Sequence, residues 1–353
     1  MSFVNAMDLL TILSGAERTC HRLVFTRSAR QNEAGNQETR WFLLEVVMSS
    51  LSKESKAQFD RAVAEFRAEG PVCVTPHKLN AFLEQTQGIE ATPAQRLRWL
   101  AIALENDRFE QGWESLRAIY QAAGQADPTD PWVLHSWGLS ASRWVEGKLR
   151  IRDVERLEGL ADEAERVLHA ALELAPKDSR IAHSLGLLYY NRPAPKEDPE
   201  AYHSRAIDWF TRALEWNPGD VLARLYLAHC FHDLKDWPRA IAEYENVDLD
   251  RLARQLPAWR AVKCREQLAH CHAYAGHTAE AVRLFSAFLD DAESWDKDQA
   301  EEYISDLDEL VDAVTHKLDH AELVRRTREL VKRVVKDPRL CWLGKRYQHL
   351  FES

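Results

Sequence analysis

Hydrophobic positions recur with helical spacing through the middle of the chain. Leu185 and Tyr189 are four residues apart and share one helical face. Further along, Ala206, Phe210 and Ala213 form a stripe at i, i+4 and i+7, which ends at an Asn-Pro-Gly-Asp turn. The pattern predicts two amphipathic helices joined as a helix-turn-helix unit, in which small residues let the helices approach closely.

This unit is repeated. The segments Leu227–Cys230 and Leu268–Cys271 have nearly the same sequence. Each is followed at the same offset by an alanine and then an aromatic residue, which are Ala240 with Tyr244 and Ala281 with Phe285. Repeats of this kind stack on one another and bury a continuous core, so the chain is predicted to be a repeat protein.

The repeated residues resemble the tetratricopeptide repeat, a unit of about 34 residues. Its pattern has Leu-Gly or Leu-Ala in the first helix, and alanine, an aromatic residue and proline in the second. The separations of 10 residues from Pro218 to Ala228 and 12 from Ala228 to Ala240 fit that frame. The resemblance implies an all-α fold, a right-handed α-solenoid of tetratricopeptide-like helix-turn-helix repeats.

The chain is expected to contain three regions: a mostly helical N-terminal region of unknown role at 1–92, a repeat array at 93–292, and C-terminal capping helices at 293–353. Two units of the array carry insertions between their helices, near residues 145–159 and 191–203. Either a lengthened helix or a loop would accommodate them.

The N-terminal region does not match the repeat. Its hydrophobic pattern predicts helices at about 38–51, 53–69 and 76–87, and a short strand at 23–26. Residues 296–351 are expected to form two or three amphipathic helices, with one apolar stripe from Tyr303 to Val314 and another from Leu323 to Val335.

Composition narrows the function classes. The chain has 353 residues, of which 45% are hydrophobic and 29% charged, so it can bury a core and is not predicted to be disordered. The formal net charge is −10 and there is no block of five or more consecutive basic residues, so nucleic-acid binding is not expected. The sequence shows no basic, apolar leader and no apolar run of about 18 residues, which predicts a cytoplasmic protein without membrane contact.

The six cysteines are scattered and form no Cys-x-x-Cys pair, so they are predicted to be reduced core residues.

In the family that the chain resembles, the first helices line a concave groove that holds the partner. Transferred onto this sequence, the groove positions are Trp132, His135, Arg143, Arg180, His183, Tyr190, Asn191, His229, His232, Asp233, Lys263, Glu266, His270 and Tyr274. Arginine and lysine there could bind carboxylates, asparagine could bond to a backbone, and the aromatic rings could supply rigid apolar contact. The expected ligand is a peptide or a segment of a partner protein.

An alternative is that these side chains belong to an ordinary solvated face, or that the groove is filled by the chain's own termini or insertions. The paired lysines and asparagines with which some family members bind chaperone tails are not reproduced at successive units, so a chaperone C-terminus is not the expected ligand.

Metal and cofactor chemistry is not predicted. His229, His232 and Asp233 share a helical face and His270 follows one repeat later, but helices packed about 10 Å apart are a wide frame for metal ligands. The sequence has no phosphate-binding glycine loop, nucleophile elbow or zinc-protease motif. No catalytic residue and no cofactor are therefore assigned.

The function expected from the sequence is that of an adaptor or scaffold that binds a peptide or partner segment in the groove. Two alternatives remain: a peptide-responsive regulatory sensor with the same fold, and an enzyme activity that resides in residues 1–92.

Overall fold

The computed structural model describes residues 51–68, 74–106, 112–148, 154–193, 198, 200–255, 259–295 and 307–335. All regular structure within these ranges is α-helical. They form two compact units that divide between Cys230 and Phe231, which we call the N-terminal unit and the C-terminal unit. The strand and the helix expected at 23–26 and 38–51 lie outside the described residues.

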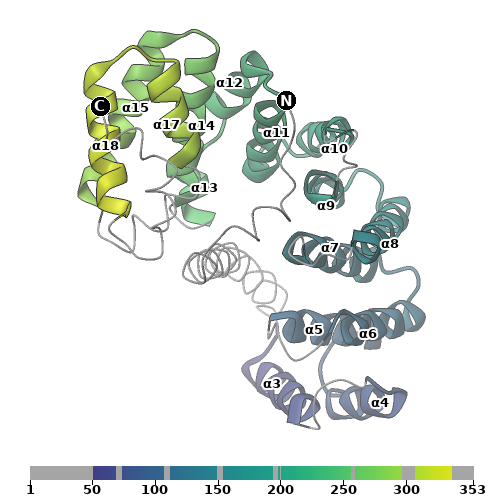
Figure 1. Cartoon of the computed structure of the whole chain (residues 1–353). Helices are drawn as coiled ribbons and strands as arrows, with labels where there is room; N and C mark the ends of the chain where they lie inside the picture. Colours follow the sequence, from purple (N-terminus) through teal and green to yellow (C-terminus); the bar gives the residue numbers. More distant parts are fainter. Residues whose placement is uncertain are drawn as a thin grey trace, which may run out of the picture. The chain divides into compact units, whose positions relative to one another are not determined.

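The N-terminal unit consists of consecutive helix pairs (Figure 1). Its helices are α3 (Lys53–Ala68), α4 (Pro76–Gln85), α5 (Pro93–Asn106), α6 (Trp113–Ala126), α7 (Pro131–Lys148), α8 (Val154–Leu174), α9 (Ser179–Asn191) and α10 (His203–Trp216). Helix α5 pairs with α6, α7 with α8 and α9 with α10, and each first helix packs on the first helix of the pair before it. This confirms the predicted helix-turn-helix repeat.

Helix α11 (Val221–Asp233) spans the division between the units. The C-terminal unit continues with α12 (Trp237–Glu245), α13 (Leu249–Gln255), α14 (Trp259–Tyr274), α15 (Thr278–Ser294), α17 (Leu307–His316) and α18 (Ala321–Val335). The short helix α13 was not predicted, because seven residues are too few to show an apolar period.

Glycines mark the close crossings between paired helices. A Cβ atom on Gly138 would lie 2.5 Å from the side chain of Leu168, and one on Gly186 would lie 2.6 Å from the ring of Phe210. Only a glycine fits at such distances, since packed carbon atoms come no closer than about 3.5 Å. The small residues of the repeat therefore set how closely each first helix approaches the second.

The two insertions have different structures. Near 145–159 the extra residues lengthen both helices, so that α7 has 18 residues and α8 has 21. Near 191–203 they form the connection between the end of α9 at Asn191 and the start of α10 at His203.

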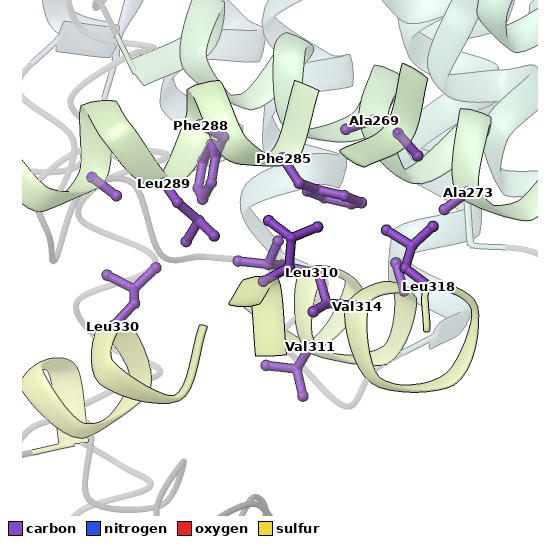
Figure 2. Close-up of a cluster of buried hydrophobic side chains, with 14 of the residues drawn as sticks. Ala269, Ala273, Phe285, Phe288, Leu289, Leu310, Val311, Val314, Leu318 and Leu330 are labelled. Atoms are coloured by element: carbon purple, nitrogen blue, oxygen red, sulfur yellow. The ribbon is translucent and has the colours of Figure 1, made fainter. Parts of the chain in front are cut away.

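The C-terminal helices complete a hydrophobic core (Figure 2). Helix α17 packs on α14, and α18 packs on α15 and α17. Phe285 is fully buried among side chains that include Leu310 and Val314 of α17 and Leu330 of α18. Leu310, Val311 and Val314 of the first predicted stripe lie on the buried face of α17, and Leu323, Leu330 and Val331 of the second lie on the buried face of α18. Tyr303 lies outside the described residues.

Cys230, Cys264 and Cys271 are free and buried, as predicted, and burial raises the pKa of the Cys264 thiol to about 12. The other three cysteines lie outside the described residues. None of the described helices combines the length and the apolar character that crossing a bilayer requires.

Candidate functional site

Three aspartates stand at the starts of α7, α9 and α11. The Asp130 carboxylate accepts a hydrogen bond from the backbone N–H of Trp132 at 2.8 Å, and Asp178 accepts one from Arg180 at 2.9 Å. Asp220 accepts one from the N–H of Ala223 at 3.0 Å. Each aspartate satisfies a backbone donor that the first turn of a helix leaves open.

Two of these aspartates, Asp178 and Asp220, also hold side chains of the predicted binding face. Asp178 accepts two bonds from the Arg180 guanidinium, at 3.1 Å and 2.8 Å, and Asp220 lies 2.9 Å from Nδ1 of His183. Burial would raise the pKa of the Asp220 carboxyl, but the bonds from His183 and the backbone outweigh it and keep that pKa below its usual value. Asp178 therefore also orients a side chain on its own helix, and Asp220 orients one on the preceding first helix.

Trp132 and His135 join α7 to α9. The Arg180 guanidinium lies over the Trp132 ring, 3.9 Å from its centroid, and the rings of Trp132 and His135 meet edge to face at 5.9 Å. Nε2 of His135 is 2.9 Å from the hydroxyl of Ser184. Burial, helped by nearby arginines, lowers the pKa of His135 to about 4, so its ring is neutral at physiological pH.

Aromatic rings continue this surface from α9 to α11. Tyr226 lies edge to face with Tyr190 at 5.5 Å and with His229 at 5.7 Å, and it stacks on the buried ring of Phe210 at 5.8 Å. His183 meets Phe210 at 5.8 Å. The contacts form two groups, both of which include residues of α9. We call these side chains together the polar–aromatic face, namely Trp132, His135, Arg180, His183, Tyr190, Tyr226 and His229.

Arg143 and Asn191, the two other predicted groove residues of this unit, are not part of the polar–aromatic face. The Arg143 side chain is only 12% exposed and lies 3.7 Å from Glu105, which is almost fully buried. Asn191 is half-buried at the last residue of α9. Arg143 therefore has an inward ion pair that its sequence position does not reveal.

The predicted groove positions of the C-terminal unit contact the chain's own helices. Lys263 Nζ is 2.9 Å from Glu266 and 3.9 Å from Glu309 of α17, and both Lys263 and Glu266 are buried. Nε2 of His232 is 3.1 Å from Nδ1 of His270, and both of these rings are buried.

Tyr274 extends this contact with α17. Its hydroxyl donates to Asp312, and Lys317 lies 4.7 Å from the centre of its ring. Burial, reinforced by Asp312, raises the pKa of Tyr274 to about 12. Asp233 is exposed, with a carboxylate oxygen 3.3 Å from Nδ1 of His232. We call this set the α14–α17 cluster; it comprises His232, Lys263, Glu266, His270, Tyr274, Glu309 and Asp312.

The two histidine rings come closer than the spacing of helix axes suggested, because long side chains bridge that gap. The part of the chain that the structure describes nevertheless holds no group of three or more His, Cys, Asp or Glu side chains able to bind a metal ion. The Lys263 ammonium beside the histidine pair also opposes a cation there.

The capping aspartates and Tyr226 are functional candidates that the sequence reasoning missed. A sequence signal exists for the aspartates, because Pro-x-Asp occurs before each of α7, α9 and α11, ending at Asp130, Asp178 and Asp220. Aspartate directly before an apolar helical period is a helix start signal.

The paired helices, the small residues at their crossings and the face carried by the first helices define a tetratricopeptide-like helical-repeat protein. No protein-family model and no curated protein matches the chain.

Solved structures with related architecture include PilW, a type IV pilus biogenesis factor, at 16% identity, 69% coverage of this chain, 93% of that chain and a TM-score of 0.45. Human IFIT1, solved as a dimer with PPP-AAAA, is 15% identical, and the match covers 88% of this chain and 67% of that chain with a TM-score of 0.49. A thermophilic tetratricopeptide protein of Thermus thermophilus, TTC0263, is 18% identical, and the match covers 63% of this chain and 97% of that chain with a TM-score of 0.36. Because these TM-scores are below 0.5, the fold assignment rests on the helix pairs of this chain.

Proposed function

We propose that the protein is an adaptor or scaffold, and that it binds an extended segment of a partner protein on the polar–aromatic face of the N-terminal unit. The observation that carries the proposal is the presence of half-buried rings on the successive first helices α7, α9 and α11, with the exposed Arg180 stacked on Trp132. Rigid aromatic rings beside an arginine are the side chains that most often dominate binding energy.

The N-terminal unit is favoured over the C-terminal unit because of exposure. The Arg180 side chain is 63% exposed, and His183, Tyr190 and His229 are half-buried. Lys263, Glu266 and His270 are instead buried beneath their own chain. A partner could reach the first group without displacing a helix, whereas reaching the second would require moving α17.

An extended segment suits this face better than a small molecule. The face crosses three successive first helices, and its donors and rings are spread along them instead of converging on one point. Side chains at intervals along a peptide could then meet successive rings, while the histidines and Arg180 bond to its polar groups.

The test compares two double variants of the full chain. Arg180→Glu with His229→Glu changes the face, and Arg212→Glu with His169→Glu places the same charges on the second helices of the same unit. Arg212 and His169 both contact the ring of Trp209, at 4.6 Å and 5.5 Å, so the control removes comparable contacts. Each protein is used to capture partners from its native cell lysate, with quantitative mass spectrometry and hydrogen exchange of the resulting complex.

We expect the face variant to lose a stoichiometric partner that the wild type and the control retain, with exchange protection on α7, α9 and α11. Melting temperatures should agree among the three proteins. A partner that the face variant retains in full, or protection confined to other helices, would show that the face is not the binding surface.

A further inference from the structure

The turn between α14 and α15 brings two histidines together. The backbone N–H of His277 donates to the carbonyl of His272 at 2.9 Å, the N–H of Gly276 donates to Ala273 at 3.3 Å, and Gly276 has a φ of +80°. These are the two hydrogen bonds and the left-handed residue of a Schellman motif, in which the residues at the positions of His272 and His277 frequently make an apolar contact. Here both are imidazoles, and their Nδ1 atoms lie 3.1 Å apart.

The separation of these two nitrogens suits two ligands of one metal ion. Imidazole nitrogens bind zinc at about 2.0–2.1 Å in tetrahedral geometry, so two of them on one ion lie about 3.4 Å apart. The present 3.1 Å is within about 0.3 Å of that value. His272 is buried at the end of α14 and His277 is exposed, so the exposed ring can make the small adjustment.

Glu245 of α12 favours the tautomer of His272 that metal binding requires. Nε2 of His272 is buried, has no hydrogen-bond partner within the described ranges and lies 3.7 Å from a carboxylate oxygen of Glu245. A lone pair on Nε2 would face that carboxylate, so the proton belongs on Nε2 and the lone pair on Nδ1, towards His277. Histidines that bind metals commonly present their other nitrogen to a carboxylate in this way.

The charges around His272 also suit a cation. Burial, with smaller contributions from His277 and Arg283, lowers the pKa of His272, whereas the carboxylates of Glu245 and Glu280 act in the opposite sense. Glu280 in turn accepts a hydrogen bond from Arg283 at 2.9 Å. The ring is therefore neutral, as a metal ligand must be, and two carboxylates act on it against one guanidinium.

The second histidine pair of this unit provides a comparison. His232 and His270 show the same 3.1 Å separation, but the Lys263 ammonium acts on that pair and opposes a bound cation. The pair at the α14–α15 turn has a carboxylate behind it instead. Local charge, and not nitrogen spacing, distinguishes the two pairs.

From the paired Nδ1 atoms at this turn and the carboxylate behind them, we propose that His272 and His277 bind a zinc ion. Because the described ranges hold no group of three or more ligating side chains, water completes the coordination, and the site exchanges its ion with free zinc. Bound zinc would fasten the start of α15 to the end of α14. The site belongs to the C-terminal unit and does not depend on the proposed function.

The test uses tag-free, full-length protein and zinc chloride alone. Calorimetric titration compares the wild type with His277→Gln and with the matched control His316→Gln. His277 begins α15 without a side-chain capping bond, so its replacement leaves the start of the helix unchanged. His316 is likewise exposed and lies 3.3 Å from a carboxylate oxygen of Asp312. A third variant, Glu245→Ala, removes the orienting carboxylate.

We expect the wild type and His316→Gln to bind a zinc ion that His277→Gln does not bind, with zinc-dependent protection from hydrogen exchange at residues 272–280. Glu245→Ala should bind zinc about tenfold or more weakly than the wild type, since His272 is then less well oriented. The melting temperature of the wild type should rise with zinc concentration, and that of His277→Gln should rise less.

Equal zinc affinity in the wild type and His277→Gln, or no zinc binding by the wild type, would overturn the site and leave the two rings as an ordinary hydrogen-bonded pair. Zinc-dependent protection confined to other parts of the chain would also overturn it. None of these results bears on the polar–aromatic face, so the proposed function is tested separately.

Discussion

His232 and His270 meet ring to ring in the C-terminal unit, with Nε2 of the first 3.1 Å from Nδ1 of the second. Such a contact needs one nitrogen to donate and the other to accept, so at least one ring must be neutral. Burial, assisted by His232 and Lys263 and opposed by Asp312, lowers the pKa of His270 to about 3. The folded protein therefore keeps His270 neutral in mildly acidic solution.

This relationship predicts a pH dependence of stability. Below its ordinary pKa of 6.5, His270 takes up a proton in the unfolded chain but not in the folded one, so the free energy of unfolding falls as the pH drops from 6.5 towards 3. In urea unfolding from about pH 7.5 to about pH 5, wild type should lose more stability than His270→Gln. Equal losses in the two proteins would show that His270 does not contribute.

Gly186 should not tolerate alanine. The added Cβ would lie 2.6 Å from the fully buried Phe210 ring, so Gly186→Ala should cost about 1–3 kcal/mol in the free energy of unfolding. Gly124 of α6 is the matched control, because a Cβ there meets nothing within 4 Å. Gly124→Ala should stabilise by about 0.5–1 kcal/mol through helix propensity. Opposite signs in thermal melts of the two variants are the expected result.

The buried Lys263–Glu266 pair predicts a non-additive effect. Lys263→Met leaves the Glu266 carboxylate without its ammonium in a site where only 4% of that side chain is exposed. The expected cost is about 3 kcal/mol or more. Lys263→Met combined with Glu266→Leu should return to within about 1 kcal/mol of wild type, because both charges are then removed together. Chemical unfolding of the two single variants and the double variant checks this; additive costs would contradict it.

Gly276 occupies the turn between α14 and α15 with a φ of +80°, and Lys235 takes φ of +59° in the turn before α12. Because a Cβ on Gly276 meets nothing within 4 Å, Gly276→Ala tests backbone conformation alone and should cost about 1 kcal/mol. Lys235→Gly should stay within about 0.5 kcal/mol of wild type, since relief of the turn is offset by greater freedom of the unfolded chain. Thermal unfolding of both variants measures the difference.

The helical repeat could be predicted because it depends on local pattern. Small and aromatic residues such as Gly186 and Phe210 occupy positions that recur from one repeat to the next. The apolar stripes ending at Val314 and Val335 mark helices α17 and α18 directly. The predicted length of α3 was also correct to within one residue at its end.

The contacts that the sequence did not reveal depend on tertiary structure. Sequence spacing places Arg143, Arg180 and Lys263 at groove positions of three different first helices. Only the fold shows that Arg143 turns towards Glu105 and that Lys263 turns towards Glu266. The contact of α17 with Tyr274 joins segments far apart in the chain, so no local pattern could reveal it. The role of Asp178 was accessible from its cap position and was overlooked.

The capping aspartates of the N-terminal unit have a consequence for how this surface can evolve. Asp178 and Asp220 each begin a helix and also hold a side chain of the polar–aromatic face, so a substitution there changes the start of the helix and the shape of the surface together. Under the proposed function, new partner preferences can therefore arise readily at Arg180 or His229, whereas the two aspartates are constrained by both selection for folding and selection for recognition.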